Sequence, residues 1–157
     1  MDVSVDLNGD AWNDFLVGIP GWRPPSYYWQ TGGAALLDAG SGLEIWRFQP
    51  PNDPDYLGVG LSVSFVPDLD GDGFHDCLVG DPAFTGAEYQ TGSVFVLNGL
   101  TASVVREHFW STFGSGPSMG GEEFGSSLLG IEDVTLDGRG EYIISSPRSD
   151  LGQGSFT

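Results

Sequence analysis

The chain alternates short apolar segments with stretches rich in Gly, Pro, Asp and Ser, and no apolar segment approaches eighteen residues. Polar and apolar positions alternate within residues 59–66, whereas residues 15–18 form a continuous apolar run that ends at Gly. Segments of this length and period predict β-strands and exclude a membrane-spanning helix. The expected strands are residues 15–18, 31–37, 43–48, 59–66, 77–80, 91–97, 103–109, 124–129 and 142–145.

Three acidic loops separate these strands at regular distances. The loops begin at Asp6, Asp68 and Asp133, so the offsets between them are 62 and 65 residues. A period of this size is typical of repeat architectures, and four short antiparallel strands per period form the blade of a β-propeller. We therefore expect an all-β fold built from antiparallel four-stranded blades.

The repeat divides residues 1–157 into a single propeller segment, an incomplete arc of about two and a half blades. We expect blade A over residues 1–50, without most of its first strand, a complete blade B over 56–113, and the first half of blade C over 120–157. A closed propeller needs about four to eight blades, and an open arc exposes sheet edges. We therefore expect self-association, with a dimer favoured, or further blades that are missing from this chain.

The second acidic loop packs four aspartates into nine residues. Their mutual repulsion is costly unless a cation lies among them, and Ca²⁺ takes six to eight oxygen ligands from carboxylates, carbonyls and water. Gly71 and Gly73 allow the chain to turn tightly around such an ion. The expected ligands are the side chains of Asp68, Asp70, Asp72 and Asp76 and the backbone carbonyl of Phe74.

The first and third acidic loops repeat this pattern. Thr135 offers a hydroxyl and Glu141 a longer carboxylate in the third loop, so we expect Ca²⁺ in the first two loops and a weaker third site. The expected ligands by position are Asp6, Asn8, Asp10, Trp12 and Asp14 in the first loop, and Asp133, Thr135, Asp137, Arg139 and Glu141 in the third.

Two rival structures also contain acidic loops of this kind. Asp and Gly favour tight turns that bind no ion, although three copies in one register favour a metal. An EF-hand shares the early ligand positions, but it requires a Glu at position twelve and flanking helices. That position is Val17, Val79 or Ile144 here, and the flanking segments are β-like, so an EF-hand is rejected.

The charge of the chain excludes several partners. There are 22 Asp and Glu residues against five Lys and Arg, for a formal charge of −17. Such a field disfavours nucleic acid and anionic membranes. The single cysteine, Cys77, excludes an internal disulfide, and because it lies in an apolar run we expect a buried thiol.

The sequence offers no catalytic constellation. Neither His75 nor His108 is placed relative to a Ser or Cys in a way that suggests nucleophilic catalysis. No phosphate-binding loop and no zinc spacing are present. We therefore expect a protein that is not an enzyme.

The segment of residues 21–29 is rich in aromatic side chains and connects the second and third strands of blade A. Successive hairpins of a blade alternate between its two ends, so this connection is expected at the end opposite to the acidic loops. Aromatic residues and Arg dominate binding hot spots. The alternative is that Tyr28 and Trp29 only pack against the blade edge. The candidate ligand-binding residues are Trp22, Arg23, Tyr27, Tyr28 and Trp29.

The order of motifs within each repeat resembles that of a known family. The segment Phe124-Gly125-Ser126-Ser127 has a variant at Val59-Gly60-Leu61-Ser62, an Asp-rich loop follows, and Val17-Gly18-Ile19-Pro20 closes the pattern. This order resembles the FG-GAP repeat of integrin α-subunits, and the resemblance covers essentially the whole chain. It implies a seven-bladed propeller, calcium in the hairpins between strands one and two, and adhesion or ligand binding. Ser145-Ser146-Pro147 departs from the pattern.

These observations predict a calcium-binding, non-catalytic propeller module of a surface or secreted protein, with a protein or glycan partner. Sites that bind calcium at roughly 10⁻⁴ M are typical of extracellular modules, so we expect a location outside the cell. Two alternatives stay open: an accessory propeller of a secreted hydrolase, and a lectin that uses the 21–29 segment.

Overall fold

The computed structural model describes residues 1–2, 5–85, 91–110 and 121–148, and these form nine β-strands. The strands are β1 (Phe15–Gly18), β2 (Ala34–Leu37), β3 (Glu44–Phe48), β4 (Ser62–Val66), β5 (Asp76–Asp81), β6 (Ser93–Leu97), β7 (Val104–Phe109), β8 (Leu128–Ile131) and β9 (Glu141–Ile144). They pair antiparallel in three sheets, β1-β2-β3, β4-β5-β6-β7 and β8-β9. The all-β, antiparallel architecture expected from the sequence is confirmed.

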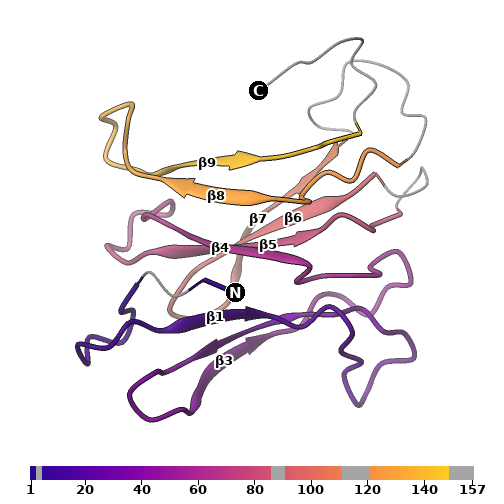
Figure 1. The fold of residues 1–157 in the computed structure, drawn as a ribbon, viewed down its shortest axis with the longest axis horizontal. Coiled ribbons are helices and arrows are strands. Elements are labelled where there is room, and N and C mark those ends of the chain that lie inside the picture. The colour runs from indigo at the N-terminus through magenta and orange to yellow at the C-terminus, as the bar shows by residue number, and fades with distance from the viewer. Residues whose placement is uncertain (3–4, 86–90, 111–120, 149–157) are drawn as a thin grey trace.

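The three sheets are stacked side by side, and the four-stranded second sheet lies between the other two (Figure 1). The first strand of that sheet, β4, contacts both β1 and β8. A short bridge pairs Asp2 with Leu16 of β1, where the sequence predicts the remnant of a first strand. None of the helices in the described ranges is long and apolar enough to cross a membrane.

Six of the observed strands begin later than predicted, β4 and β8 among them. The predicted range 59–66 starts as a strand only at Ser62, because the backbone of Val59 bonds to the first sheet instead. The Val59 amide donates to the Thr31 carbonyl at 3.1 Å, and the Gly33 amide donates to the Val59 carbonyl at 2.8 Å. At the next boundary the Phe124 amide likewise donates to the Thr91 carbonyl at 3.1 Å. These segments join neighbouring sheets.

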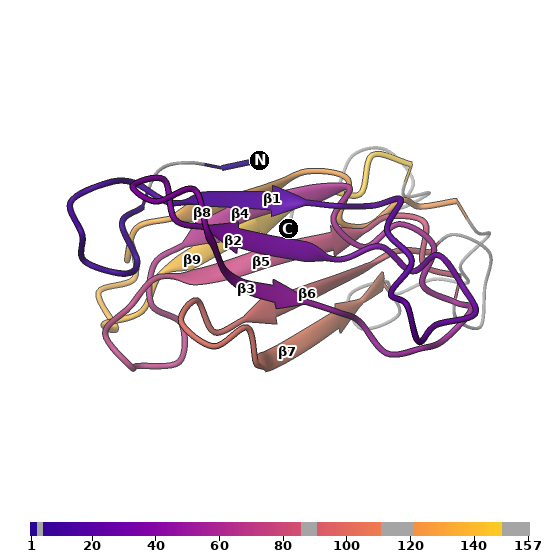
Figure 2. The same cartoon turned by 90° about the horizontal axis from the view of Figure 1, so that it is seen from below.

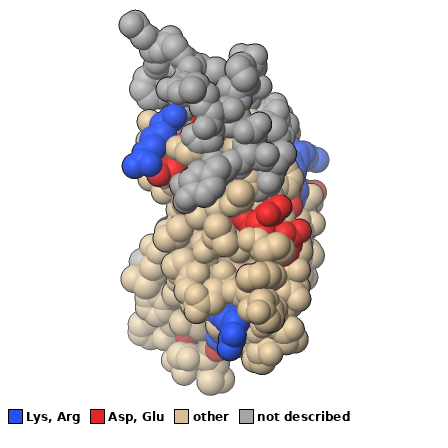
Figure 3. All heavy atoms as spheres, turned by 90° about the vertical axis from the view of Figure 1, so that its right-hand side faces the viewer, with Lys and Arg blue, Asp and Glu red and all other residues tan. Residues whose placement is uncertain are grey.

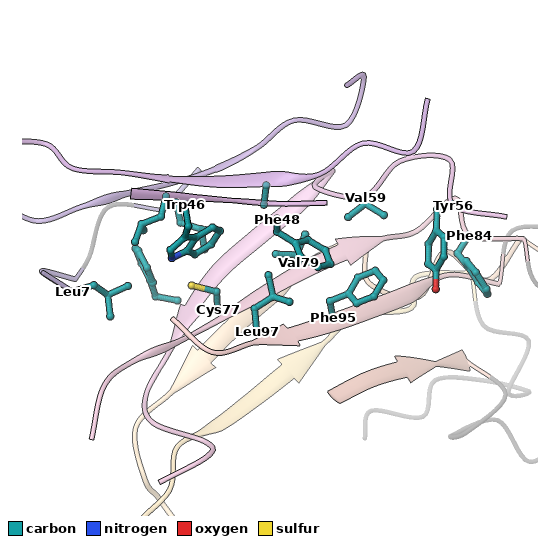
Figure 4. Packing of buried hydrophobic residues seen from close by; sticks show 14 residues of the cluster. Leu7, Trp46, Phe48, Tyr56, Val59, Cys77, Val79, Phe84, Phe95 and Leu97 are labelled. Carbon is teal, nitrogen blue, oxygen red and sulfur yellow. The ribbon is translucent and has the colours of Figure 1, made fainter. Parts of the chain in front are cut away.

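The largest core lies between the first and second sheets (Figure 4). The ring of Phe48 from β3 meets that of Phe95 from β6 at a centroid distance of 5.0 Å. The indole nitrogen of Trp46, also from β3, donates to the carbonyl oxygen of Gly99 at 2.7 Å. Cys77 is fully buried in this core, as predicted, and burial raises the pKa of its thiol. Contacts between neighbouring sheets therefore stabilise the fold in addition to the pairing of strands within each sheet.

Glycines allow the sheets to approach closely. A Cβ on Gly80 of β5 would lie 2.5 Å from the carbonyl oxygen of Gly125, which precedes β8, and Gly60 meets Gly18 at the preceding boundary. Gly60 and Gly125 both have positive φ, at 94° and 91°. The glycine before one sheet therefore packs on a strand glycine of the previous sheet at both boundaries.

The connections separate into two groups at opposite ends of the molecule. The hairpin loops at residues 6–14, 68–76 and 133–141 lie at one end, and the connections around residues 19–33 and 49–61 lie at the other (Figures 1 and 2). The aromatic segment is thus opposite to the acidic loops, as expected. The end of the predicted blade C, residues 149–157, falls outside the described residues.

Candidate functional site

The three acidic hairpins share one backbone conformation; they are called loop one (residues 6–14), loop two (68–76) and loop three (133–141). The fourth and sixth residues of each loop have positive φ. Glycine occupies both positions in loop two, with φ of 89° at Gly71 and 90° at Gly73. Ala11 in loop one and Leu136 in loop three adopt the same conformation, with φ of 74° and 61°. The shared geometry is therefore maintained even where the residue disfavours it.

In loop two, Asp68 folds the chain around its own carboxylate. Its two oxygens accept hydrogen bonds from the amides of Gly71 at 2.6 Å and Gly73 at 2.7 Å. Burial raises the pKa of Asp68, but these amides outweigh that effect and the pKa is lowered overall. The first residue of the loop is therefore held as a carboxylate.

The far side of loop two is fixed by Asn98, a residue that the loop pattern in the sequence does not include. The side-chain amide of Asn98, which follows β6, donates to Asp70 at 2.9 Å and to Asp72 at 2.7 Å. Asn98 is 7% exposed and 22 residues beyond the end of the loop. The one signal in the sequence was its place directly after a third strand, which Asp38 shares in blade A.

Asp76 closes loop two from the core side. It is fully buried and accepts hydrogen bonds from the amides of Leu69 at 2.8 Å and Gly99 at 3.2 Å. Burial above all, together with the charges of Asp70 and Asp72, raises the pKa of Asp76 to about 6. Each of Asp68, Asp70 and Asp76 has an oxygen within 4.8 Å of the other two, and Asp72 lies outside this group.

Loop three repeats this arrangement. Asp133, Asp137 and Glu141 place oxygens within 4.8 Å of one another. Glu141 accepts a hydrogen bond from the Val134 amide at 2.7 Å, as Asp76 does from Leu69. Arg139 extends to loop two, where its guanidinium donates to the Leu69 carbonyl at 3.2 Å. This acidic cluster therefore forms although Thr135 and Glu141 depart from the sequence pattern.

Loop one has the same hydrogen bonds but a more open set of acids. Asp6 accepts from the amides of Gly9 at 2.7 Å and Ala11 at 2.8 Å. Asp14 is fully buried and accepts from the Leu7 amide at 2.9 Å, while its second oxygen has no hydrogen-bond partner. Among the described residues, the acids of loop one do not form a three-residue group within 4.8 Å.

The two other predicted ligands of loop one act on Asp10. The side-chain oxygen of Asn8 accepts from the Asp10 amide at 2.9 Å, and the Trp12 amide donates to Asp10 at 2.8 Å. The Trp12 side chain itself is 63% exposed. In loop two the Phe74 amide donates to Asp72 at 2.8 Å in the same way.

These loops fit a hard divalent cation. Their donor groups are carboxylates, an amide and a hydroxyl, and oxygen ligands are those that Ca²⁺ and Mg²⁺ take. The buried, unpartnered oxygen of Asp14 is an unsatisfied acceptor that a cation would stabilise. Burial is the main cause of the raised pKa of Asp76, and the negative charges of Asp70 and Asp72 in the same loop add to it.

The aromatic segment divides into supporting and exposed residues. Trp22 packs beneath the guanidinium of Arg47, which lies 4.9 Å from its ring centroid, and the Tyr27 hydroxyl donates to the Pro50 carbonyl at 2.7 Å. Tyr28 and Trp29 are 78% and 44% exposed, with their rings edge to face at 4.7 Å. Trp22 and Tyr27 therefore contact the rest of the molecule, whereas Tyr28 and Trp29 are exposed to solvent.

The exposed residues border a hollow at this end of the molecule. Its volume is about 550 Å³, and it is lined by Pro20, Gly21, Arg23, Tyr28, Trp29, Gln30 and Leu57. Most of the described atoms seen from this end belong to neither acidic nor basic residues (Figure 3). This surface differs from the opposite end, where the acidic loops gather.

Comparisons with known proteins agree with this geometry. Residues 59–97 match the FG-GAP repeat. The chain is 34% identical to integrin alpha-7 of Rattus norvegicus over 83% of the chain and 11% of that protein, and 29% identical to integrin alpha-3 of Cricetulus griseus over 90% and 13%. It is also 28% identical to a phosphatidylinositol-glycan-specific phospholipase D of Dictyostelium discoideum over 95% of the chain and 18% of that protein. The chain spans less than a fifth of the length of each of these relatives.

Proposed function

Because this chain is an integrin α-like FG-GAP repeat protein, we propose that it is a calcium-binding, non-catalytic propeller module that mediates adhesion or ligand binding. The observation that carries the proposal is the repetition of one oxygen-rich hairpin at the same end of three successive sheets. It belongs to a surface or secreted protein.

The chain is one propeller segment in this proposal, with blade A over residues 1–50, blade B over 56–113 and blade C over 120–157. Sheets of three, four and two strands support this division. On the third sheet Leu129 and Ile143 are exposed side by side, and on the first sheet Phe15 and Ile45 are exposed. We expect these faces to be covered by further blades or by a second copy of the chain.

Calcium stabilises the hairpins of loops one and two, with a weaker third site in loop three. An affinity of roughly 10⁻⁴ M is typical of extracellular modules, and millimolar calcium then adds about 1.4 kcal/mol per site. Cytosolic calcium would leave such sites empty, so the proposed location is extracellular. The ion has a structural role, since it supplies no reacting group.

The partner is a protein or a glycan, and it binds at the end opposite to calcium. The exposed Tyr28 and Trp29, together with Arg23, are the residue types that dominate binding hot spots. Trp22 and Tyr27 support this surface from below through their contacts with Arg47 and Pro50. A lectin would use the same residues to stack on sugar rings.

A second candidate function rests on the similarity to a phosphatidylinositol-glycan-specific phospholipase D. The chain would then be an accessory propeller of a secreted hydrolase whose catalytic part lies outside these residues. Assays of the purified chain against glycosylphosphatidylinositol-linked substrates are decisive only if hydrolysis is observed. Hydrolysis by the chain itself would overturn the non-catalytic proposal.

Calcium titration by calorimetry tests the proposed function most directly. We expect at least two ions per chain with dissociation constants on the order of 10⁻⁴ M, and an unfolding temperature that rises with calcium. A glycan array then separates a glycan ligand from a protein ligand. Absence of both heat and stabilisation at millimolar calcium would overturn the proposal.

A further inference from the structure

The turns that follow β2 and β6 have the same structure. The Asp38 amide donates to the Leu43 carbonyl at 2.8 Å, and the Gly42 amide donates back to the Asp38 carbonyl at 2.8 Å. Asn98 makes the corresponding bonds with Ser103 and Ala102, both at 2.9 Å. A register shift precedes each turn, between residues 36 and 37 and between 96 and 97. Asp38 and Asn98 are therefore equivalent positions in blades A and B.

Both turns extend to the acidic loop of their own blade. In blade B the contact is the pair of hydrogen bonds from Asn98 to Asp70 and Asp72. In blade A the carboxyl groups of Asp38 and Asp10 both lie beside Gly40 of the turn. A Cβ on Gly40 would lie 2.7 Å from an oxygen of Asp10 and 3.2 Å from one of Asp38, which places both at the same point of the turn.

The chemistry of the two contacts differs. An amide donates to carboxylates, so Asn98 stabilises Asp70 and Asp72 without a cation. Two carboxylates repel each other unless they share a proton or a cation. In loop one Asp14 is fully buried, and its second carboxylate oxygen has no hydrogen-bond partner. Loop one therefore has an additional carboxylate and an unsatisfied acceptor where loop two has a neutral amide.

We propose that in blades A and B the turn between the third and fourth strands is a second arm of the metal site. Asp38 supplies a further carboxylate ligand to the ion in loop one, and Asn98 positions Asp70 and Asp72 for the ion in loop two. This inference rests on the proposed calcium binding. The folding of loop one should then depend on the ion more strongly than the folding of loop two, because Asp38 adds a negative charge whereas Asn98 adds neutral hydrogen bonds.

Terbium luminescence tests the first part, since Trp12 in loop one is an exposed tryptophan next to the expected ligands. The part of the emission that disappears in Trp12→Phe identifies loop one. Asp38→Asn is expected to weaken terbium and calcium binding there by about 10- to 100-fold. The matched control is Ser41→Ala, which removes a partner of Asp38 within the same turn and retains the carboxylate.

The outcomes test the ligand role of Asp38 and the proposed calcium binding separately. An affinity of Asp38→Asn within about twofold of the wild type, or an equal loss in Ser41→Ala, would overturn the ligand role of Asp38. If the wild-type chain binds neither calcium nor terbium, the calcium proposal itself fails, whereas the contacts of the two turns stand.

The exchange Asn98→Asp tests the second part. Aspartate retains the acceptor that bonds to the amides of Leu100 and Thr101, so the turn is conserved, but it replaces the donor with a negative charge. We expect the variant to unfold at lower urea concentration than the wild type without calcium and to recover at millimolar calcium. Equal stability of variant and wild type in calcium-free buffer would overturn the positioning role of Asn98.

Discussion

Gly18 of β1 and Gly60 pack backbone to backbone across the boundary between the first and second sheets: a Cβ on Gly18 would lie 1.9 Å from the Gly60 carbonyl oxygen. In the opposite direction, a Cβ on Gly60 would lie 2.1 Å from the carbonyl oxygen of Gly33. Real Cβ atoms essentially never approach so closely, and the obstacles are backbone atoms that cannot rotate away. The glycines of the FG-GAP pattern are therefore a requirement of sheet stacking.

Gly18→Ala is accordingly expected to lower the free energy of unfolding by about 3 kcal/mol, at the upper end of overpacking effects. Urea unfolding followed by tryptophan fluorescence measures the change. The control is Gly21→Ala, where an added Cβ has nothing within 4 Å and the expected change is within about 0.5 kcal/mol. Equal stability of the two variants would contradict the role assigned to the Gly18–Gly60 contact.

Leu136→Gly is expected to stabilise loop three. Leu136 has a φ of 61° and is 87% exposed, so glycine relieves backbone strain without loss of packing. The gain should be about 0.5–1 kcal/mol, because the greater freedom of glycine in the unfolded chain offsets part of the relief. Val134→Gly in the same loop is the control: Val134 is 67% exposed and lacks positive φ, so that variant should lose stability.

Asp81 is expected to make stability fall as the pH rises from about 4 to about 6. It is fully buried and accepts from the amides of Leu57 at 3.1 Å and Ala83 at 3.0 Å, and burial raises its pKa from 3.8 to about 6. The folded state therefore retains a proton that the unfolded state releases in this range, so its stabilising effect is present below pH ~4 and lost above pH ~6.

The comparison of wild type with Asp81→Asn isolates this effect. Urea unfolding at half-unit steps of pH in calcium-free buffer should show a shallower decline for the variant between about pH 4 and 6. Parallel curves for the two proteins would mean that Asp81 titrates alike in both states.

Trp22→Ala and Trp29→Ala should separate support from recognition in the aromatic segment. Trp22 contacts Arg47, and its ring lies against Gly33, so its loss should cost about 2 kcal/mol of stability. Trp29 is 44% exposed, and its loss should change stability by no more than about 0.5 kcal/mol. Thermal unfolding measures both, and a larger loss in Trp29→Ala would reverse the assignment.

The strands and their grouping were predictable because each is short, contains several apolar residues and is separated from the next by turn residues at a regular period. The beginnings of β4 and β8 were not. Val59-Gly60 and Phe124-Gly125 have strand-like composition, but their backbone groups bond to, or pack on, the neighbouring sheet. The alternation of apolar and polar residues within one repeat does not show which of its backbone groups bond to the next repeat.

The acidic loops were predictable from their spacing, whereas Asn98 and Asp38 were not. Each lies more than twenty residues beyond its loop in the sequence and is brought beside it only because the third strand returns to the same end of the blade. The division of the aromatic segment into supporting and exposed residues was not predictable for the same reason. Trp22 and Trp29 are seven residues apart and of one type, and only the position of Arg47 and Gly33 distinguishes them.

The hydrogen bond from Trp46 to Gly99 limits where one repeat can be separated from the next. Gly99 accepts from Trp46 of the preceding blade and donates to Asp76 in the acidic hairpin of its own blade. Transfer of blade B alone would therefore leave behind Trp46, the hydrogen-bond partner of Gly99. Chimaeras cut between Phe48 and Tyr56, which lose Trp46, should therefore be less stable than chimaeras cut before β3, which retain it.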